Sequence, residues 1–399
     1  MSNLLQNLGL QIEFILDAMR LRPIRFSGEQ AIEAAKNGSG LSDFGSDAFL
    51  EPLNLSTNEL NSIKRLTFGG KVMARESFRQ FLIRRLRIVR DHKENPEISE
   101  IPIKRPIIIT GLPRTGTTLL HSALADHPDL QFIQPWQLEE SDADRQTCID
   151  ESKAKIRSLA QAMPHMDAMH AFDSPLECSQ LFLPTFLTDY FQVCFGLEGY
   201  KRWLDARPLE AWIEAYQFYK MQLQRLAWQE QSEQRWILKS PHHLTHLDAL
   251  LAVFPDACII QTHRDPVDVI HSSARYYGSI YQLHCKPVPH AHHEQRCLEL
   301  FSSQVTRGMD LRTTLPEQNI LDISYQELIH KPAEILDLVS DRYDLPNDAS
   351  IKSHRKAWLD THHWKRDNKL GALPRSKPSI ETDKINDHFA AYSQCYNWR

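Results

Sequence analysis

Two hydrophobic periodicities organise the chain between residues 106 and 345. Short apolar runs rich in isoleucine alternate there with longer stretches in which apolar residues recur every three or four positions. The short runs predict strands, and the longer stretches predict helices. Strands that alternate with helices form parallel sheets covered on both faces, so we expect an α/β fold. The predicted strands are 106–110, 236–240, 257–262 and 319–325, and the helices that follow them lie near 119–124, 244–254, 267–277 and 326–343.

The two ends of the chain and an insertion within the α/β region show helical periodicity and no predicted strands. Residues 1–104 predict a helical N-terminal region, and residues 105–345 predict the α/β core. A helical insertion at about 140–230 interrupts this core, and residues 346–399 predict an irregular, partly helical extension. The individual helices are expected at 57–67, 70–92, 142–169, 176–187 and 209–229, with a further amphipathic helix marked by Leu5, Leu8, Ile12, Ile15 and Met19.

The helix predicted over 70–92 is unusually rich in arginine. We expect these side chains to form a solvated basic face, with contact to a substrate or a phosphate group as the alternative. The arginines are Arg75, Arg79, Arg84, Arg85, Arg87 and Arg90.

Charge and composition narrow the function classes. The 399 residues include 46 Lys and Arg against 51 Asp and Glu, which gives a formal net charge of −5. A general nucleic-acid binder needs a basic face, so any anion site here must be local. No apolar run reaches the roughly 18 residues of a membrane span. The seven cysteines form no C-x-x-C pair and the N-terminus carries no signal-peptide pattern, so we expect reduced thiols and a cytoplasmic location.

A glycine-bracketed loop follows the first predicted strand. Gly111 and Gly116 are five residues apart, as in the phosphate-binding P-loop, and a helix follows them. Such a loop presents backbone N–H groups and a helix N-terminus to an anion. ATP- and GTP-binding loops have lysine after the second glycine, but this chain has Thr117, followed by Thr118, and carries its basic group inside the loop at Arg114. We therefore expect a P-loop-type sheet that binds an anionic group without metal-assisted γ-phosphoryl transfer.

Two further basic residues are expected at the same edge of the sheet. Lys239 lies at the end of one predicted strand, and Arg264 follows the next. The carboxyl edge of an open parallel sheet is where such folds bind ligands. Ser272 follows Arg264 by eight residues, about two helical turns, so its hydroxyl can face the same anion. This arrangement predicts a second phosphate site apart from the loop.

These segments resemble the sulfotransferases that use 3′-phosphoadenosine 5′-phosphosulfate (PAPS), most closely a bacterial branch with Pro-Arg-Thr-Gly-Thr-Thr loops. The similarity extends from about residue 40 to 345. It includes 111–120, 238–241, 254–257, 262–266, Ser272 and 322–328.

The resemblance implies a role for each matching residue. The loop residues Arg114, Thr115, Gly116, Thr117 and Thr118 would hold the 5′-phosphosulfate. Lys239 would lie near the phosphosulfate bridge and Tyr325 near the adenine. Arg264 and Ser272 would hold the 3′-phosphate. The implied reaction moves a sulfonate group from PAPS to an acceptor hydroxyl and releases 3′,5′-ADP, with no metal required.

The sequence offers two candidates for the general base that removes the proton of the acceptor hydroxyl. The Lys-Thr-His motif of the aryl-type branch is replaced here by Lys239-Ser240-Pro241, so its histidine is absent at that position. We consider His243 as the first candidate for the base and Glu177 as the second. A glutamate that a related branch places about twenty residues after the loop arginine is also missing, and the nearest carboxylates are Glu139 and Glu140.

Two other function classes stay open at this stage: a nucleoside-triphosphate-dependent P-loop kinase, and a non-catalytic member of the fold. The acceptor could be a small molecule, a glycan or a lipid, and the chain could form a homo-oligomer. A His- and Cys-rich stretch at 284–297 predicts a loop. Its spacing fits no standard zinc site, so we expect a solvated or substrate-facing loop there, with a metal site as the alternative.

Overall fold

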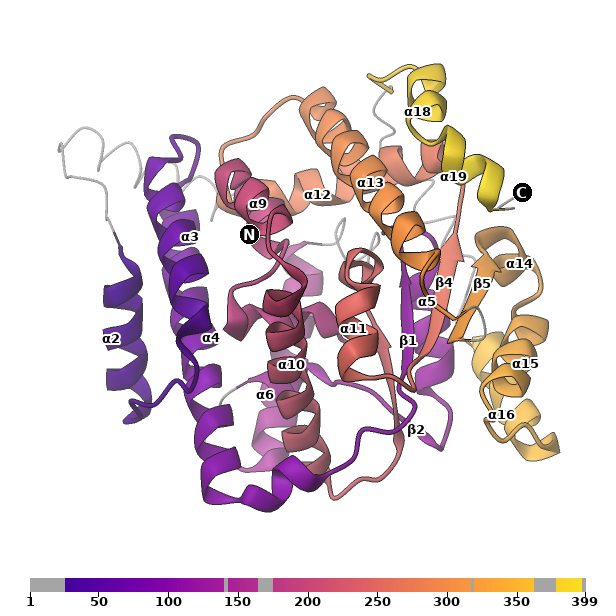
Figure 1. Ribbon diagram of the computed structural model, residues 1–399, viewed down its shortest axis with the longest axis horizontal. Coiled ribbons are helices and arrows are strands. Elements are labelled where there is room, and N and C mark those ends of the chain that lie inside the picture. The colour runs from indigo at the N-terminus through magenta and orange to yellow at the C-terminus, as the bar shows by residue number, and fades with distance from the viewer. Residues whose placement is uncertain (1–25, 140–142, 164–174, 317–318, 362–377, 397–399) are drawn as a thin grey trace.

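A parallel sheet lies at the centre of the computed structural model, which describes residues 26–139, 143–163, 175–316, 319–361 and 378–396 (Figure 1). Within these residues the sheet has five strands in the order β2-β3-β1-β4-β5, and all adjacent pairs are parallel. The predicted α/β fold is confirmed. The strands are β1 (Ile107–Gly111), β2 (Leu130–Gln131), β3 (Arg235–Lys239), β4 (Cys258–His263) and β5 (Ile320–Ser324).

The central strands β1, β3 and β4 are buried almost completely, and apolar side chains cover both faces of the sheet. Successive side chains of a strand point to opposite faces. Ile107 and Ile109 accordingly pack into a cluster with Leu120 of α5 and Val339 of α15, whereas Ile108 packs into another cluster with Leu250 of α11. The helices around the sheet are α5 (Thr117–Ala125), α11 (Leu247–Val253), α12 (Pro266–His284), α13 (His290–Arg312), α14 (Tyr325–His330), α15 (Pro332–Arg342) and α16 (Ala349–Thr361).

The N-terminal helices and the insertion form a second helical layer. In Figure 1, α2 to α4 lie at one end of the molecule, and α10 lies between them and the sheet. The N-terminal elements are α2 (Gly28–Ser39), η1 (Asp47–Phe49), α3 (Leu50–Ser62), α4 (Phe68–Glu94) and η2 (Pro96–Glu100). The insertion holds η3 (Pro135–Leu138), α6 (Arg145–Ala162), η4 (Cys178–Thr185), α8 (Tyr190–Phe195), α9 (Glu198–Asp205) and α10 (Leu209–Glu230).

Several boundaries differ from the sequence prediction. The helix expected at 57–67 is α3, which begins at Leu50, and the helix expected at 176–187 is the 3₁₀ element η4, which contains Pro184. The single helix expected at 326–343 is broken into α14 and α15, with Pro332 at the start of the second. The amphipathic helix expected around Leu5 to Met19 lies outside the described residues.

The His- and Cys-rich stretch is mostly helical, contrary to the predicted loop. Helix α13 begins at His290 and continues for 23 residues. Its buried residues Cys297, Leu298, Phe301 and Val305 recur at helical spacing. The extension at 346–399 was predicted to be partly helical, and its described residues include α16 and two short helices, α18 (Thr382–His388) and α19 (Ala390–Cys395).

The arginines of α4 do not form a solvated basic face. Arg84, Arg85 and Arg87 are buried. The Arg84 guanidinium donates to the carbonyls of Leu138 and Gln180, at 2.7 and 3.2 Å. Arg84 thus exchanges water for carbonyl oxygens of the insertion, and this contact joins the two parts of the helical layer. Among the described residues, no helix is both long and apolar enough to cross a membrane.

Candidate functional site

The glycines of the loop are required by the close approach of neighbouring strands and helices. Gly111 has a φ of 129°, and a Cβ there would lie 2.5 Å from the carbonyl oxygen of Thr262 on β4. Gly116 has a φ of 91° and directly precedes α5. A Cβ at Gly116 would lie 2.9 Å from Leu328 and 3.0 Å from Tyr325. The loop can therefore hold its shape only with glycine at both ends.

The three threonines of the loop occupy different environments. Thr115 is fully buried, and its hydroxyl donates to the Leu112 carbonyl at 2.6 Å and lies 2.6 Å from the Thr262 hydroxyl. Thr117, also buried, is the first residue of α5. The Thr118 hydroxyl accepts a hydrogen bond from Lys239 Nζ at 3.3 Å. Thr115 thus shapes the loop, whereas Thr118 connects it to the end of β3.

The structure brings Arg114, Arg264, Ser272 and Tyr325 together beside the loop. Arg114 has a left-handed φ of 68°, and its Nε donates to the Ser272 hydroxyl at 3.1 Å. Arg264 Nη1 donates to the Arg114 carbonyl at 3.0 Å. The guanidinium of Arg264 also lies 4.1 Å from the ring centre of Tyr325. We call these four residues the arginine cluster.

Electrostatics make the arginine cluster receptive to an anion. Burial lowers the pKa of Arg114, and the nearby Arg264 and Arg275 lower it further, although Tyr276 acts in the opposite direction. Arg264 Nη2 pairs with Asp268 at 3.1 Å, but its Nε is buried without a hydrogen-bond partner in the described part of the chain. A buried donor without a partner is costly, and a phosphate oxygen would satisfy it.

Lys239 and Glu177 form a separate ion pair at the end of β3. The Lys239 side chain is completely buried, and its Nζ lies 2.5 Å from Glu177 Oε1. Glu177 directly precedes η4 of the insertion, and its side chain is 33% exposed. The two residues are 62 positions apart in sequence. The pair therefore combines an interior cation with a carboxylate that solvent and ligands can reach.

His243 lies in the interior behind this pair. Its side chain is fully buried, with Nδ1 2.7 Å from the Tyr216 hydroxyl and Nε2 3.1 Å from Cys178 Sγ. Burial, with a smaller effect of the nearby His242, lowers the pKa of His243 to about 3. Both ring nitrogens thus face protein atoms. Because Cys178 is the neighbour of Glu177, the imidazole connects the base of η4 to the turn that follows Lys239.

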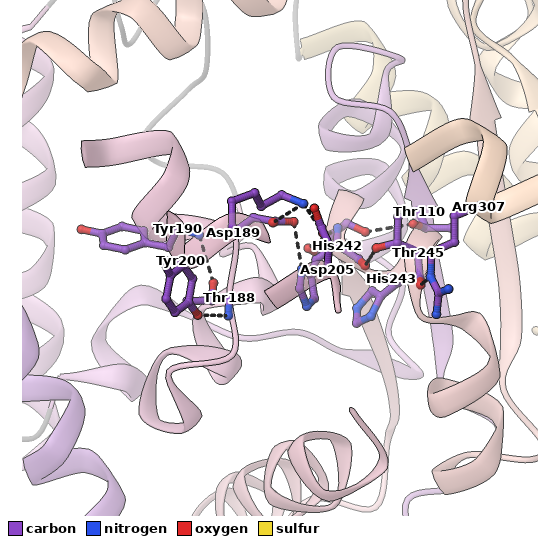
Figure 2. A network of polar contacts seen from close by, with 12 residues as sticks. Thr110, Thr188, Asp189, Tyr190, Tyr200, Asp205, His242, His243, Thr245 and Arg307 are labelled. Atoms are coloured by element: carbon purple, nitrogen blue, oxygen red, sulfur yellow. Dashed lines mark hydrogen bonds and ion pairs between the residues drawn. The ribbon is translucent and has the colours of Figure 1, made fainter. Parts of the chain in front are cut away.

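A buried polar network holds that turn, η5 (Pro241–Thr245), against several elements (Figure 2). Thr110 donates to the Ser240 carbonyl at 3.0 Å, and Arg307 donates to the Thr245 carbonyl at 2.7 Å. His242 Nδ1 lies 3.4 Å from Asp189 Oδ2. Burial would raise the pKa of Asp189, but Lys201 and His242 outweigh it and lower this pKa to about 2. The network fixes the backbone on the carboxyl side of Lys239.

Tyr276 and Asp189 lie near the site, and the sequence analysis did not identify either of them. Tyr276 lies on α12 with its ring 6.0 Å from the guanidinium carbon of Arg114. Tyr276 follows Ser272 by four residues, so both lie on one face of the helix, and this spacing could have indicated Tyr276 from the sequence. No sequence signal indicated Asp189, because its partners come from α9 and η5.

The described residues contain no group of three or more His, Cys, Asp or Glu side chains arranged to hold a metal ion. In the stretch 284–297, His290 pairs with Glu294 at 3.2 Å, while Cys285 and Cys297 are buried free thiols.

Comparisons with known proteins agree with this architecture. The structure is similar to sulfotransferase STF9 from Mycobacterium avium, with a TM-score of 0.80, 23% identity, and coverage of 94% of this chain and 98% of that one. It is also similar to sulfotransferase STF1 from Mycobacterium tuberculosis H37Rv, with a TM-score of 0.75, 23% identity, and coverage of 93% and 100%. At this identity the likeness shows the shared fold.

The sequence itself identifies the family. No curated protein sequence matches the chain significantly. However, the sequence model of the sulfotransferase family matches residues 106–349, which include the phosphate loop, Glu177, Lys239 and the whole arginine cluster. The chain therefore belongs to the sulfotransferase family, and the enzyme is a sulfotransferase.

Proposed function

We propose that the enzyme transfers the sulfonate group of PAPS to a hydroxyl of an acceptor and releases 3′,5′-ADP. The arginine cluster is the observation that carries this proposal. It supplies a buried, partnerless Nε of Arg264 beside a loop suited to a first phosphate. A donor with one phosphosulfate group and one additional 3′-phosphate matches two adjacent anion sites.

The proposed contacts follow the two halves of the site. The loop from Arg114 to Thr118 and the N-terminus of α5 would hold the 5′-phosphosulfate. Arg264 and Ser272 would hold the 3′-phosphate, with Tyr325 beside the adenosine. This assignment is supported by the contact of Arg264 with both the Arg114 carbonyl and the Tyr325 ring.

The ion pair of Lys239 and Glu177 supplies the chemistry in this proposal. The acceptor oxygen forms a bond to sulfur in line with the bond that breaks between sulfur and the bridging oxygen. Lys239 would stabilise the charge that develops on the bridging oxygen, an effect typically worth about 10²–10³ in rate. Glu177 would accept the hydroxyl proton, which typically contributes about 10²–10⁴.

Glu177 is the better supported of the two base candidates. Its carboxylate is partly exposed and touches Lys239, whereas both nitrogens of His243 face buried protein atoms. A general base must come within hydrogen-bond distance of the proton that it removes. We therefore assign the base to Glu177 and a supporting position to His243.

Sulfonate transfer itself tests the proposal. The purified enzyme is incubated with PAPS and a panel of alcohols, phenols, glycans and lipids, and mass spectrometry detects sulfated products. Formation of 3′,5′-ADP together with a sulfated acceptor is the expected result. The panel also distinguishes the small-molecule, glycan and lipid classes of acceptor.

Nucleotide binding separates this proposal from a kinase-like use of ATP. We expect 3′,5′-ADP to raise the melting temperature strongly and Mg·ATP to raise it little, because binding to the folded state stabilises it. Thr117 occupies the position where ATP-binding loops need lysine. A larger shift with Mg·ATP would contradict the PAPS assignment.

A further inference from the structure

The C-terminal segment, residues 378–396, contacts the end of β4, the strand that directly precedes Arg264. Ile385 of α18, Tyr392 of α19 and Phe389 between these helices belong to one apolar cluster with Ile270 of α12 and Phe301 of α13. Figure 1 shows the two yellow helices beside α13, near the upper end of β4. That end of β4 is His263, the residue before Arg264.

His263 is fixed from two sides by residues distant in sequence. Its Nε2 lies 2.7 Å from Asp322 Oδ1 on β5, and its Nδ1 lies 2.9 Å from the Tyr392 hydroxyl on α19. The ring of Tyr396 stacks on the imidazole with the centroids 4.2 Å apart. Arg312 holds Asp322 with two hydrogen bonds, of 2.5 and 2.8 Å.

The chemistry of these groups sets the direction of each hydrogen bond. Burial would raise the pKa of Asp322, but Arg312 and His263 outweigh it and lower this pKa far below its usual range. The carboxylate therefore only accepts, so Nε2 of His263 carries its proton. Nδ1 of the neutral ring then accepts from the Tyr392 hydroxyl. The oxygen of this hydroxyl is in turn hydrogen-bonded by the Arg264 backbone.

A single hydroxyl from α19 thus contacts His263, the last residue of β4, and the backbone of Arg264, which follows it. We propose that Tyr392 is a positioning residue for the nucleotide site, which holds the Arg264 backbone so that its guanidinium meets the 3′-phosphate. The C-terminal segment would then set the preference for 3′-phosphorylated nucleotides. This inference depends on the proposed function, because it assumes that Arg264 contacts the 3′-phosphate.

Tyr392→Phe tests the inference because it removes the hydroxyl and keeps the ring. Dissociation constants for 3′,5′-ADP and 5′-AMP are measured by calorimetry. We expect Kd for 3′,5′-ADP to rise about 3- to 10-fold, as for the loss of one hydrogen bond. Kd for 5′-AMP should change by less than about twofold, because the Arg264 guanidinium has no 3′-phosphate to contact.

Tyr343→Phe is the matched control. The Tyr343 hydroxyl is also buried and donates to β4, but at the Ile259 carbonyl, at 2.5 Å and near the start of the strand. Its removal should lower the melting temperature without changing the ratio of the two dissociation constants. A second measurement, amide hydrogen exchange at Arg264, should become faster in Tyr392→Phe than in Tyr343→Phe.

The outcomes distinguish this inference from the proposed function. If the unaltered enzyme binds 3′,5′-ADP and 5′-AMP equally, the 3′-phosphate assignment fails, and the positioning role fails with it. If the unaltered enzyme discriminates but Tyr392→Phe weakens both nucleotides equally, or neither, only the positioning role is overturned.

Discussion

The two halves of the site differ in whether their positive charges are already paired within the protein. In the arginine cluster, Arg114 and Arg264 lie together, and one buried guanidinium nitrogen has no partner within the described chain. At the end of β3, the buried cation Lys239 is already matched by Glu177 at 2.5 Å. The first half is arranged to receive negative charge from a ligand. The second is already balanced, and under the proposed function it would take a proton from the acceptor hydroxyl.

The halves also differ in how they are assembled. Arg114 and Arg264 lie in turns between a strand of the sheet and the helix that follows it, and Ser272 lies on α12 itself. Glu177 comes from the insertion and reaches Lys239 only because η4 packs against β3, with Cys178 held by His243. Changes in the two halves should therefore have separable effects on binding and turnover.

Loss of the carboxylate at position 177 should have the largest effect. In Glu177→Gln, kcat for sulfonate transfer is expected to fall by about 10²–10⁴, because the proposed base is removed. Affinity for 3′,5′-ADP should stay nearly constant. Steady-state kinetics with PAPS and an acceptor from the panel measure the rate.

Glu139→Gln is the matched control for this change. Glu139 also pairs with a lysine, Lys155, and it is the described carboxylate nearest in sequence to the position of the base in a related branch. We expect its rate to stay within about twofold, since surface ion pairs contribute little. A near-normal rate in Glu177→Gln would remove the base assignment.

Arg264→Ala should separate the two halves most clearly in binding. Loss of a charge-assisted contact is expected to raise Kd for 3′,5′-ADP by about 10- to 100-fold. Binding of 5′-AMP should hardly change, because it lacks the phosphate that Arg264 would hold. Calorimetry with both nucleotides makes the comparison, and equal losses would count against the 3′-phosphate site.

His243→Asn should reduce kcat by about tenfold, less than Glu177→Gln, because it loosens the link between Cys178 and the turn after Lys239. The pH profile of kcat/KM distinguishes support from proton transfer. If His243 only supports the site, the profile keeps its shape. A loss larger than that of Glu177→Gln, together with a missing limb of the profile, would restore His243 as the base.

Acidification should destabilise the fold through its buried histidines. Burial lowers the pKa of His121 and of His243 to about 3, against an ordinary value of about 6.5. Below pH 6.5 the unfolded chain binds protons that these folded imidazoles do not, so the free energy of unfolding rises with pH. Their contribution is complete above about pH 6.5 and is lost as the pH falls toward 3.

Urea titrations at several pH values measure this effect. From pH 6.5 to pH 5, each such histidine should lower the free energy of unfolding by about 1–2 kcal/mol. His243→Asn should flatten the pH dependence, whereas His388→Asn, at an exposed position, should leave it unchanged. Stability that stays level on acidification would contradict the burial argument.

Local pattern was sufficient for the sheet and for the placement of Arg114 and Arg264 near each other. The buried strands are continuous apolar runs, so their positions were predicted within a residue or two, apart from the two-residue β2. Gly111, Arg114 and Arg264 lie at the turns between these strands and their helices, where sequence spacing alone sets their place. The family likeness rests on the same segments.

Tertiary packing decided the rest. The sequence analysis placed His243 ahead of Glu177 as the base. It could not show that His243 is buried and Glu177 partly exposed, because this depends on contacts between η4, α10 and β3. It also could not show that Arg84 and Arg85 are buried and donate hydrogen bonds to backbone carbonyls of other segments. Spacing along the chain determines which residues share a strand end or a helix face. Which side chains lose water and find partners depends on contacts between distant segments, and those form only in the folded protein.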